Sequence, residues 1–221
     1  MVWPDKRLLD LFGIEMPIVQ APMANATGVD MAVAVSEAGG LGSFPCAGLS
    51  DDKIREGVAA IRSRTRKPIN LNFFCHELAP ADEARDAAWL ERLAPYYAEL
   101  GAEMPKLPLK ATIFRFTEAT CAAVEALRPE VVSFHFGLPD AALVAHVKKA
   151  GCKIISSATT LREARFLAER GVDAIIAQGA EAGGHRGMFL ETEIASQISG
   201  IGAKDLTRQL ADQAQSQLGK L

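Results

Sequence analysis

One expected strand carries a serine and a histidine on the same face. In VVSFHFG, at residues 131–137, strict alternation puts Ser133 and His135 together, opposite Phe134 and Phe136. An imidazole titrates near neutral pH, so it can act as a general acid or base. A lone strand histidine is more often a hydrogen-bonded structural residue, so the neighbouring strands must decide between the two interpretations.

Amide side chains fall at corresponding places in other expected strands. INLNFF, at residues 69–74, puts Asn70 and Asn72 on one face. Gln20 comes late in the first apolar segment, and Gln178 ends the last one. A single amide at a strand end usually caps the following loop. Four strands that send amide or imidazole groups toward their C-terminal ends favour a functional site, because (β/α) barrels build their sites at that end.

Two glycine-rich segments differ in what precedes them. EAGGHRG, at residues 181–187, follows an expected strand, so its backbone N–H groups can bind an anionic or flat ligand. The adjacent His185 and Arg186 favour a binding loop over a merely flexible one. AGGLGS, at residues 38–43, follows a helix and holds no G-x-G-x-x-G, which excludes a Rossmann fingerprint.

A repeated unit supplies the elements that position these residues. An Ala-rich helix, a Gly stop and a short apolar strand recur, as in LREARFLAERG–VDAIIAQG. Strands that alternate with helices predict a parallel sheet, either doubly wound or barrel-shaped. Six strands are expected, at residues 17–22, 41–46, 69–74, 131–137, 153–157 and 174–178.

The long interval between the third and fourth strands is expected to be helical. One helix is predicted near residues 81–100, bent at Pro95, and another near 118–127. ATIFRF, at residues 111–116, is interpreted as a connecting segment. Thr160 and Glu163 predict a capping box at the start of the helix before the sixth strand.

Composition narrows the class of protein. The chain has 221 residues, 49% of them hydrophobic, and a formal net charge of −3. The slight acidity and the lack of a Lys/Arg cluster argue against nucleic-acid and membrane partners. The N-terminus has no signal-peptide pattern. Four scattered cysteines predict reduced thiols in a cytoplasmic protein, with no metal site.

Five segments carry a family resemblance and keep their order along the chain. They are IVQAPM (18–23), SEAGGLGS (36–43), KPINLNFFCH (67–76), VVSFHFGLP (131–139) and AQGAEAGGHRG (177–187). Together they resemble the nitronate monooxygenases, formerly called 2-nitropropane dioxygenases. Flavin enoyl-acyl carrier protein reductases share the QAPM-like, AGGLG and AGGH elements, but the SFHFG and HRG segments favour the nitronate branch.

The resemblance implies a TIM-type (β/α)8 barrel that binds FMN, with about six βα units visible in this sequence. It implies oxidation of alkyl nitronates or nitroalkanes by O2 to a carbonyl compound and nitrite. By the same resemblance, His135 would be the base that removes the α-proton, and His185 and Ser133 would line the substrate pocket. The implied FMN contacts are Met23, Asn72, Gln178 and Gly183.

The resemblance is interrupted after FLETEIASQ, at residues 189–197. Family members continue through two more strands with phosphate-binding loops, whereas this sequence passes to a segment like the family's far C-terminal helix. We expect residues 1–194 to form barrel units, residues 195–221 to form a helical segment joined after a missing stretch, and the functional polypeptide to be longer.

The alternatives are a shortened, non-catalytic binding or assembly module and a flavin enzyme of the enoyl-reductase kind. The longer polypeptide is favoured, because six strands alone would leave two apolar edges unpaired. The physiological substrate and the oligomeric state, homo-oligomers included, stay open.

Overall fold

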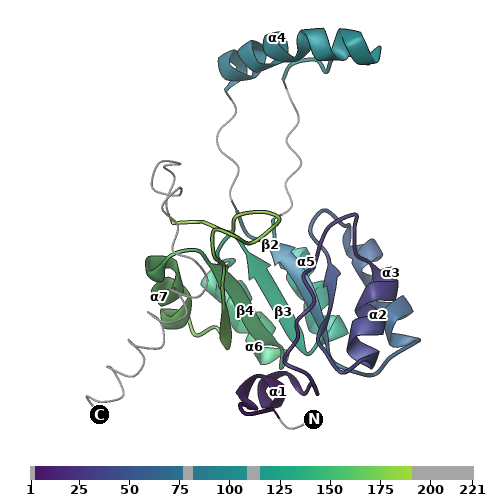
Figure 1. The fold of residues 1–221 in the computed structure, drawn as a ribbon, viewed down its shortest axis with the longest axis vertical. Coiled ribbons are helices and arrows are strands. Elements are labelled where there is room, and N and C mark those ends of the chain that lie inside the picture. Colours follow the sequence, from purple (N-terminus) through teal and green to yellow (C-terminus); the bar gives the residue numbers. More distant parts are fainter. Residues whose placement is uncertain (1–2, 77–81, 109–114, 191–221) are drawn as a thin grey trace. The chain divides into compact units, whose positions relative to one another are not determined.

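Five parallel strands form the centre of the larger unit in the computed structural model (Figure 1). They pair in chain order: β1 (Gly42–Pro45), β2 (Ile69–Phe74), β3 (Val131–His135), β4 (Lys153–Ala158) and β5 (Ala174–Ala177). The expected first strand is reduced to one parallel bridge, between Val19 and Leu41. Pro17 and Pro22 flank this bridge and lack the N–H donors that would extend it. Sequential parallel pairing is the order that a barrel requires.

The structure describes residues 3–76, 82–108 and 115–190. They divide into two compact units, one of residues 3–76 with 115–190 and one of residues 82–108. The domain boundary expected after residue 194 and the junction expected between residues 195 and 203 lie outside the described residues.

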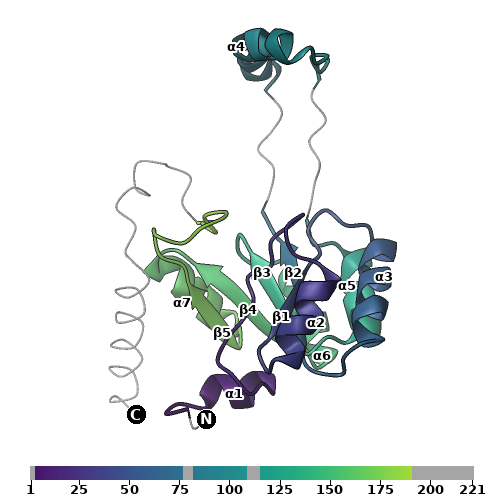
Figure 2. The same cartoon turned by 45° about the vertical axis from the view of Figure 1, so that its right-hand side comes forward.

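The N-terminal ends of the strands are closed by an apolar cluster. Phe12, at the end of α1 (Arg7–Phe12), packs with Leu41 before β1, Val131 at the start of β3 and Ile155 in the first half of β4. Figure 2 shows α1 at this foot of the sheet, at the opposite end from residues 179–190. With this end filled by hydrocarbon, the polar groups of the inner face lie beyond it, on the side of the carboxyl ends of the strands.

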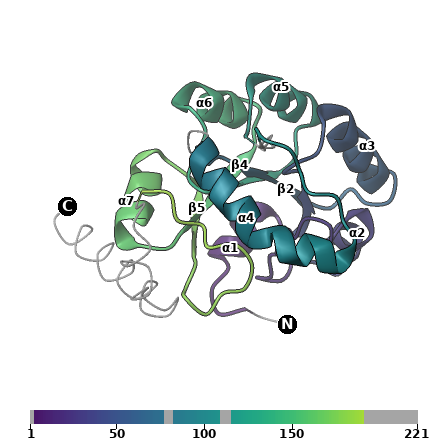
Figure 3. The ribbon, with the colours of Figure 1, turned by 90° about the horizontal axis from the view of Figure 1, so that it is seen from above.

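Helices cover the outer face of the sheet. Figure 3 shows them in an arc around the strands. Their bounds are α2 (Val29–Glu37), α3 (Asp51–Arg62), α5 (Glu118–Leu127), α6 (Ala141–Lys149) and α7 (Leu161–Glu169). Ser50 and Thr117 cap the starts of α3 and α5, and α7 begins with the predicted Thr160–Glu163 capping box. Alternate strand residues, Leu71 and Phe134 among them, pack outward into the core beneath these helices.

The end of β3 differs from the expectation. The strand ends at His135, two residues earlier than predicted, because Phe136 and Gly137 have φ angles of 64° and 92°. This left-handed turn breaks the alternation, so the Phe136 ring lies 4.4 Å from the His135 ring, centroid to centroid. The prediction that Phe136 faces away from His135 was therefore wrong.

The smaller unit contains α4 (Glu83–Leu100), which confirms the helix expected there. Asp82 caps its start by accepting a hydrogen bond from the Arg85 N–H, and Gly101 ends it in the left-handed conformation. Pro95 lies within the helix. Of ATIFRF, residues 111–114 lie outside the described residues, and Arg115 forms a single bridge with Phe74.

Candidate functional site

A buried polar layer lies on the inner face of β1, β2 and β3. The Asn70 Nδ2 donates to the hydroxyl oxygens of Ser43 (3.0 Å) and Ser133 (2.9 Å). The Asn72 Nδ2 donates to the same Ser133 oxygen at 2.9 Å. Ser133 is only 3% exposed, so its hydroxyl orients two amides instead of opening to a wide pocket. Asn72 is the outer of the two amides and lies one strand away from His135.

His135 is bonded through both ring nitrogens. Its Nε2 lies 3.2 Å from the backbone oxygen of His185, and its Nδ1 lies 3.2 Å from the Ser157 hydroxyl. A carbonyl oxygen only accepts, so these contacts assign the proton of the neutral ring to Nε2. Nδ1 then accepts a hydrogen bond from the Ser157 hydroxyl.

The surroundings of His135 favour its neutral form. Burial lowers the pKa of His135 below its ordinary value of 6.5, because the charged imidazolium loses hydration. The bond to the His185 carbonyl opposes this decrease, whereas the nearby imidazoles of His185 and His76 add to it. At pH 7 the ring is therefore uncharged, which is the form that a general base needs.

The loop after β5 lies directly on the His135 ring. The Gln178 Nε2 donates to the His185 oxygen at 2.8 Å, and the Gly187 N–H donates to the Gln178 Oε1 at 2.6 Å. A Cβ added to Gly187 would lie 2.5 Å from the His135 Cε1. Glycine at residue 187 is thus the residue that lets the HRG backbone approach the imidazole this closely.

A buried carboxylate anchors the far end of the same loop. Glu163 is fully buried, and its Oε2 accepts from Thr159 N and Oγ1 (both 2.7 Å) and from Thr160 N (3.2 Å). Its Oε1 accepts from the N–H groups of Phe189 (2.7 Å) and Leu190 (3.4 Å). The sequence predicted the capping box, but it did not indicate that this carboxylate also anchors the loop that carries His185.

The structure brings most of the predicted polar residues to one end of the sheet. His135, His185 and Gln178 share the hydrogen bonds described above, and Asn72 lies beside Ser133 in the pairing of β2 with β3. Met23 and Gly183 lie in exposed loops. Met23 is 50% exposed, and a Cβ on Gly183 would meet no atom within 4 Å.

Sequence reasoning missed Ser157, His76 and Phe74 as site residues. The signal was present, because the alternation that places Asn72 inward continues through Phe74 to His76 in INLNFFCH. The same alternation in KIISSA places Ser157 inward with Ile155. These inward positions pointed to the site only once the neighbouring strands were known.

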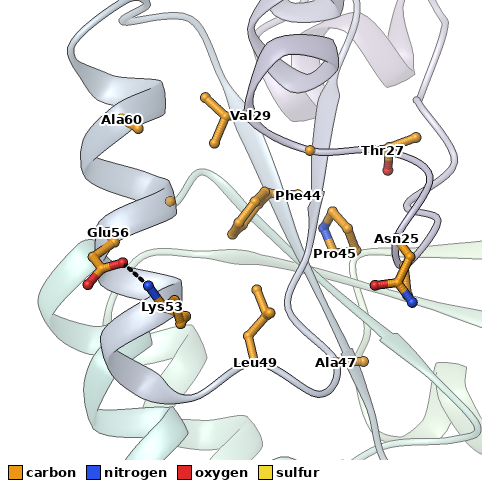
Figure 4. A pocket seen from close by; sticks show the side chains of 13 residues that line it. Asn25, Thr27, Val29, Phe44, Pro45, Ala47, Leu49, Lys53, Glu56 and Ala60 are labelled. Atoms are coloured by element: carbon orange, nitrogen blue, oxygen red, sulfur yellow. Dashed lines mark hydrogen bonds and ion pairs between the residues drawn. The ribbon is translucent and has the colours of Figure 1, made fainter.

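A separate cavity of about 530 Å³ lies between residues 24–29, the end of β1 and α3 (Figure 4). Its walls are largely apolar, with Phe44, Val29 and Leu49 among them, and Lys53 and Glu56 form an ion pair beside it. None of the predicted catalytic or flavin-binding residues lines it. The chemistry described above therefore belongs to the mouth of the sheet, not to this cavity.

These features define an α/β protein of the TIM-barrel class, with its polar groups at the carboxyl ends of sequentially paired strands. A solved structure titled nitroalkane oxidase from Streptomyces ansochromogenes superposes with a TM-score of 0.83 at 33% identity, over 93% of this chain and 57% of that chain. A family model described as nitronate monooxygenase matches residues 5–213, and the chain belongs to this family.

Curated relatives agree with this assignment. The nitronate monooxygenase of Paraburkholderia phytofirmans is 47% identical over 185 residues, which cover 83% of this chain and 50% of the relative. The nitronate monooxygenase of Pseudomonas aeruginosa is 44% identical over 207 residues, which cover 93% of this chain and 58% of the relative. FabK from Thermotoga maritima is a more distant structural neighbour, with a TM-score of 0.59 at 27% identity over 83% of this chain and 47% of that chain. This chain spans about half the length of the relatives it matches.

Proposed function

We propose that this chain carries the proton-abstracting centre of an FMN-dependent enzyme that oxidises alkyl nitronates and nitroalkanes with O2, giving a carbonyl compound and nitrite. The observation that supports this most directly is a neutral, partly buried His135 at the mouth of the sheet. The relatives named nitronate monooxygenase and nitroalkane oxidase supply the substrate class.

In this proposal, Asn72, Gln178, Met23 and Gly183 hold the flavin ring. The fit rests on open space at the Gly183 backbone and on two amides, Asn72 within β2 and Gln178 directly after β5, which suit a flat ligand with polar edges. FMN, when bound, supplies the electron and oxygen chemistry. The Gln178 amide already bonds the 185–187 backbone, so its contribution to the flavin would include fixing the loop beside the ring.

The chain's own part in the reaction is to move one proton. For Nε2 to accept the α-proton, the imidazole takes its other tautomer, with Nδ1–H donating to the Ser157 hydroxyl oxygen, and the His185 carbonyl leaves Nε2. His185 is exposed, so its side chain is available to the substrate once the loop has moved. Ser133 would contribute indirectly, because its hydroxyl orients the Asn72 amide.

Replacing His135 tests the proposal. His135→Asn is expected to lower turnover of neutral nitroalkanes by about 10²–10⁴-fold, the usual contribution of a general base. Preformed nitronates need no deprotonation, so their turnover should be largely retained. Oxygen consumption and nitrite release measured on both substrate forms give the answer. Equal loss on both would remove the base role.

Flavin content separates this proposal from the alternatives. A non-catalytic binding module would purify without stoichiometric FMN, whereas the proposed enzyme carries it, and Asn72→Ala should lower the occupancy measured by absorbance. The nitronate branch is favoured over the FabK-like one because the superposition is closer, with a TM-score of 0.83 against 0.59.

Partners and location follow the same proposal. We expect small-molecule nitronates and O2 as the partners, with no nucleic acid or membrane. No helix among residues 3–76, 82–108 and 115–190 has the length and apolar character needed to cross a bilayer. Four buried, unpaired cysteines support a cytoplasmic location.

A further inference from the structure

The left-handed turn after β3 places a phenylalanine where sequence alternation would not. Phe136 has a φ of 64°, a strained conformation for a bulky residue, and such strain persists only where the surroundings enforce it. Here Gly137, at a φ of 92°, lies under the Phe189 ring, and its carbonyl oxygen accepts a hydrogen bond from the Ser156 hydroxyl at 3.0 Å. The turn is therefore fixed from both sides.

Phe136 and Phe74 form a continuous apolar surface, the aromatic wall. Their ring centroids lie 5.1 Å apart at an interplanar angle of 81°, which is an edge-to-face contact. The rings of His76, His135 and His185 all lie within 6.0 Å of both phenylalanines, centroid to centroid. Both phenylalanines are only partly buried, so part of each ring is left for a ligand.

The wall gives the site two adjoining surfaces of different chemistry. On one side, His135 presents a neutral base beside the Asn72 amide layer. On the other, Phe136 and Phe74 offer hydrocarbon. A substrate that suits both surfaces is a carbon acid with an attached alkyl chain, whose acidic carbon lies at His135 while the chain lies on the rings.

We propose that Phe136, supported by Phe74, is the specificity-determining residue of this site: its ring binds the hydrocarbon chain of the substrate and keeps water away from His135. This inference rests on the proposed function and adds to it a preference for longer alkyl chains. Phe136 acts on the proton step only through His135, so for that step it is a positioning residue.

The protonation behaviour of His135 agrees with such shielding. Burial is the largest cause of its lowered pKa, and the Phe136 ring is in contact with the imidazole. Two other titratable groups act on His135 in the part of the chain that the structure describes, His76 after β2 and His185 in the loop after β5. The Phe136 ring also contacts both of these imidazoles, so Phe136→Tyr, which keeps the ring, is the control that separates the effect of the ring on His135.

Chain-length dependence is the main test. Preformed nitronates of nitroethane, 1-nitropropane, 1-nitrobutane and 1-nitropentane avoid the deprotonation step. For the unmodified protein, kcat/KM should rise by up to about fourfold per added methylene while the chain contacts the wall. Phe136→Ala should flatten this rise, and Phe136→Tyr should keep it. A slope unchanged in Phe136→Ala, or a uniform loss at every chain length, would overturn the proposal.

Two further measurements exclude trivial explanations. Phe136→Gly removes the ring and also relieves the backbone strain, so it should flatten the rise as Phe136→Ala does; a flattened rise in the glycine variant alone would assign the effect to strain.

The pKa of His135, measured by NMR without substrate, should rise toward 6.5 in Phe136→Ala but not in Phe136→Tyr. An unchanged pKa in Phe136→Ala would overturn the shielding role. If the unmodified protein oxidises no nitronate, the proposed function fails, and the titration still decides whether the wall shields His135.

Discussion

At the scale of single residues, the site is built from contacts that fix the protonation state of one imidazole. His135 bonds the Ser157 hydroxyl through Nδ1 and the His185 carbonyl through Nε2, and burial lowers its pKa. The ring is thus held neutral and oriented before any substrate binds. Because the folded protein disfavours the protonated form of His135, the protein is expected to be less stable at low pH.

This lower stability leads to a prediction on pH. The unfolded chain binds a proton at His135 near the ordinary pKa of 6.5, whereas the folded chain binds it at lower pH. Stability is therefore fully present above pH 6.5 and falls as the pH drops from there through the folded pKa, by about 1.4 kcal/mol for each unit of difference. Urea unfolding at pH 7.5 and 5.5 should show a smaller loss in His135→Asn than in the unmodified protein. The same pH dependence in both would contradict the pKa direction.

Gly187 supports a second prediction at this scale. An added Cβ would lie 2.5 Å from the His135 Cε1 and 2.9 Å from its Nδ1, so Gly187→Ala must displace the imidazole or the loop. We expect at least a tenfold fall in nitroalkane turnover, because misplacing a catalytic group by about 1 Å costs up to about 10²-fold. Gly28→Ala is the matched control, since its Cβ meets no atom within 4 Å. Full activity in Gly187→Ala would show that the loop does not rest on His135 in solution.

At the scale of elements, one carboxylate joins the helix α7 to the loop that covers the site. Glu163 completes the capping box of α7, and its second oxygen accepts from the Phe189 and Leu190 N–H groups. The loop is therefore anchored at Gln178 where it begins and at Glu163 where it ends. The helix start and the position of His185 depend on the same side chain.

Glu163→Gln should weaken both the start of α7 and the attachment of the loop that carries His185. The amide nitrogen cannot accept, so one group of buried N–H donors loses its partner, at a cost of about 1–3 kcal/mol in the free energy of unfolding. Proteolysis within residues 179–190 should also become faster. Glu169→Gln, an exposed residue at the end of the same helix, is the control for the charge change. A Glu163 variant as stable and as protease-resistant as the control would show that the carboxylate is not an anchor.

At the scale of the whole molecule, the larger unit separates its apolar and polar regions along the strands. Hydrocarbon fills the space under the helices and the N-terminal ends of the strands, and polar side chains occupy the inner face from the buried amide layer to the carboxyl ends. All four cysteines are buried, consistent with the reduced thiols expected from their spacing.

Thiol chemistry tests this burial. Burial raises the pKa of Cys152 to about 11, and it raises the pKa of Cys46 and Cys75 as well, so thiolates are scarce at neutral pH. Labelling with an aromatic disulfide reagent at pH 8 should be slow in the folded protein and should reach four thiols per chain in urea. Fast labelling of a thiol in the folded state would mean that one of these side chains opens to solvent.

The sequence by itself determined the strands β1 to β5, the capped start of α7 and the face on which Ser133 and His135 lie, because periodicity and capping are local properties of the chain. It also determined the family, through ordered motifs that the family model matches. Only the tertiary structure decided what surrounds His135. The Phe136 turn is fixed by Phe189 and Ser156, and the proton on Nε2 is assigned by the His185 carbonyl, fifty residues away. Such contacts join segments distant in the chain, and local alternation carries no information about them.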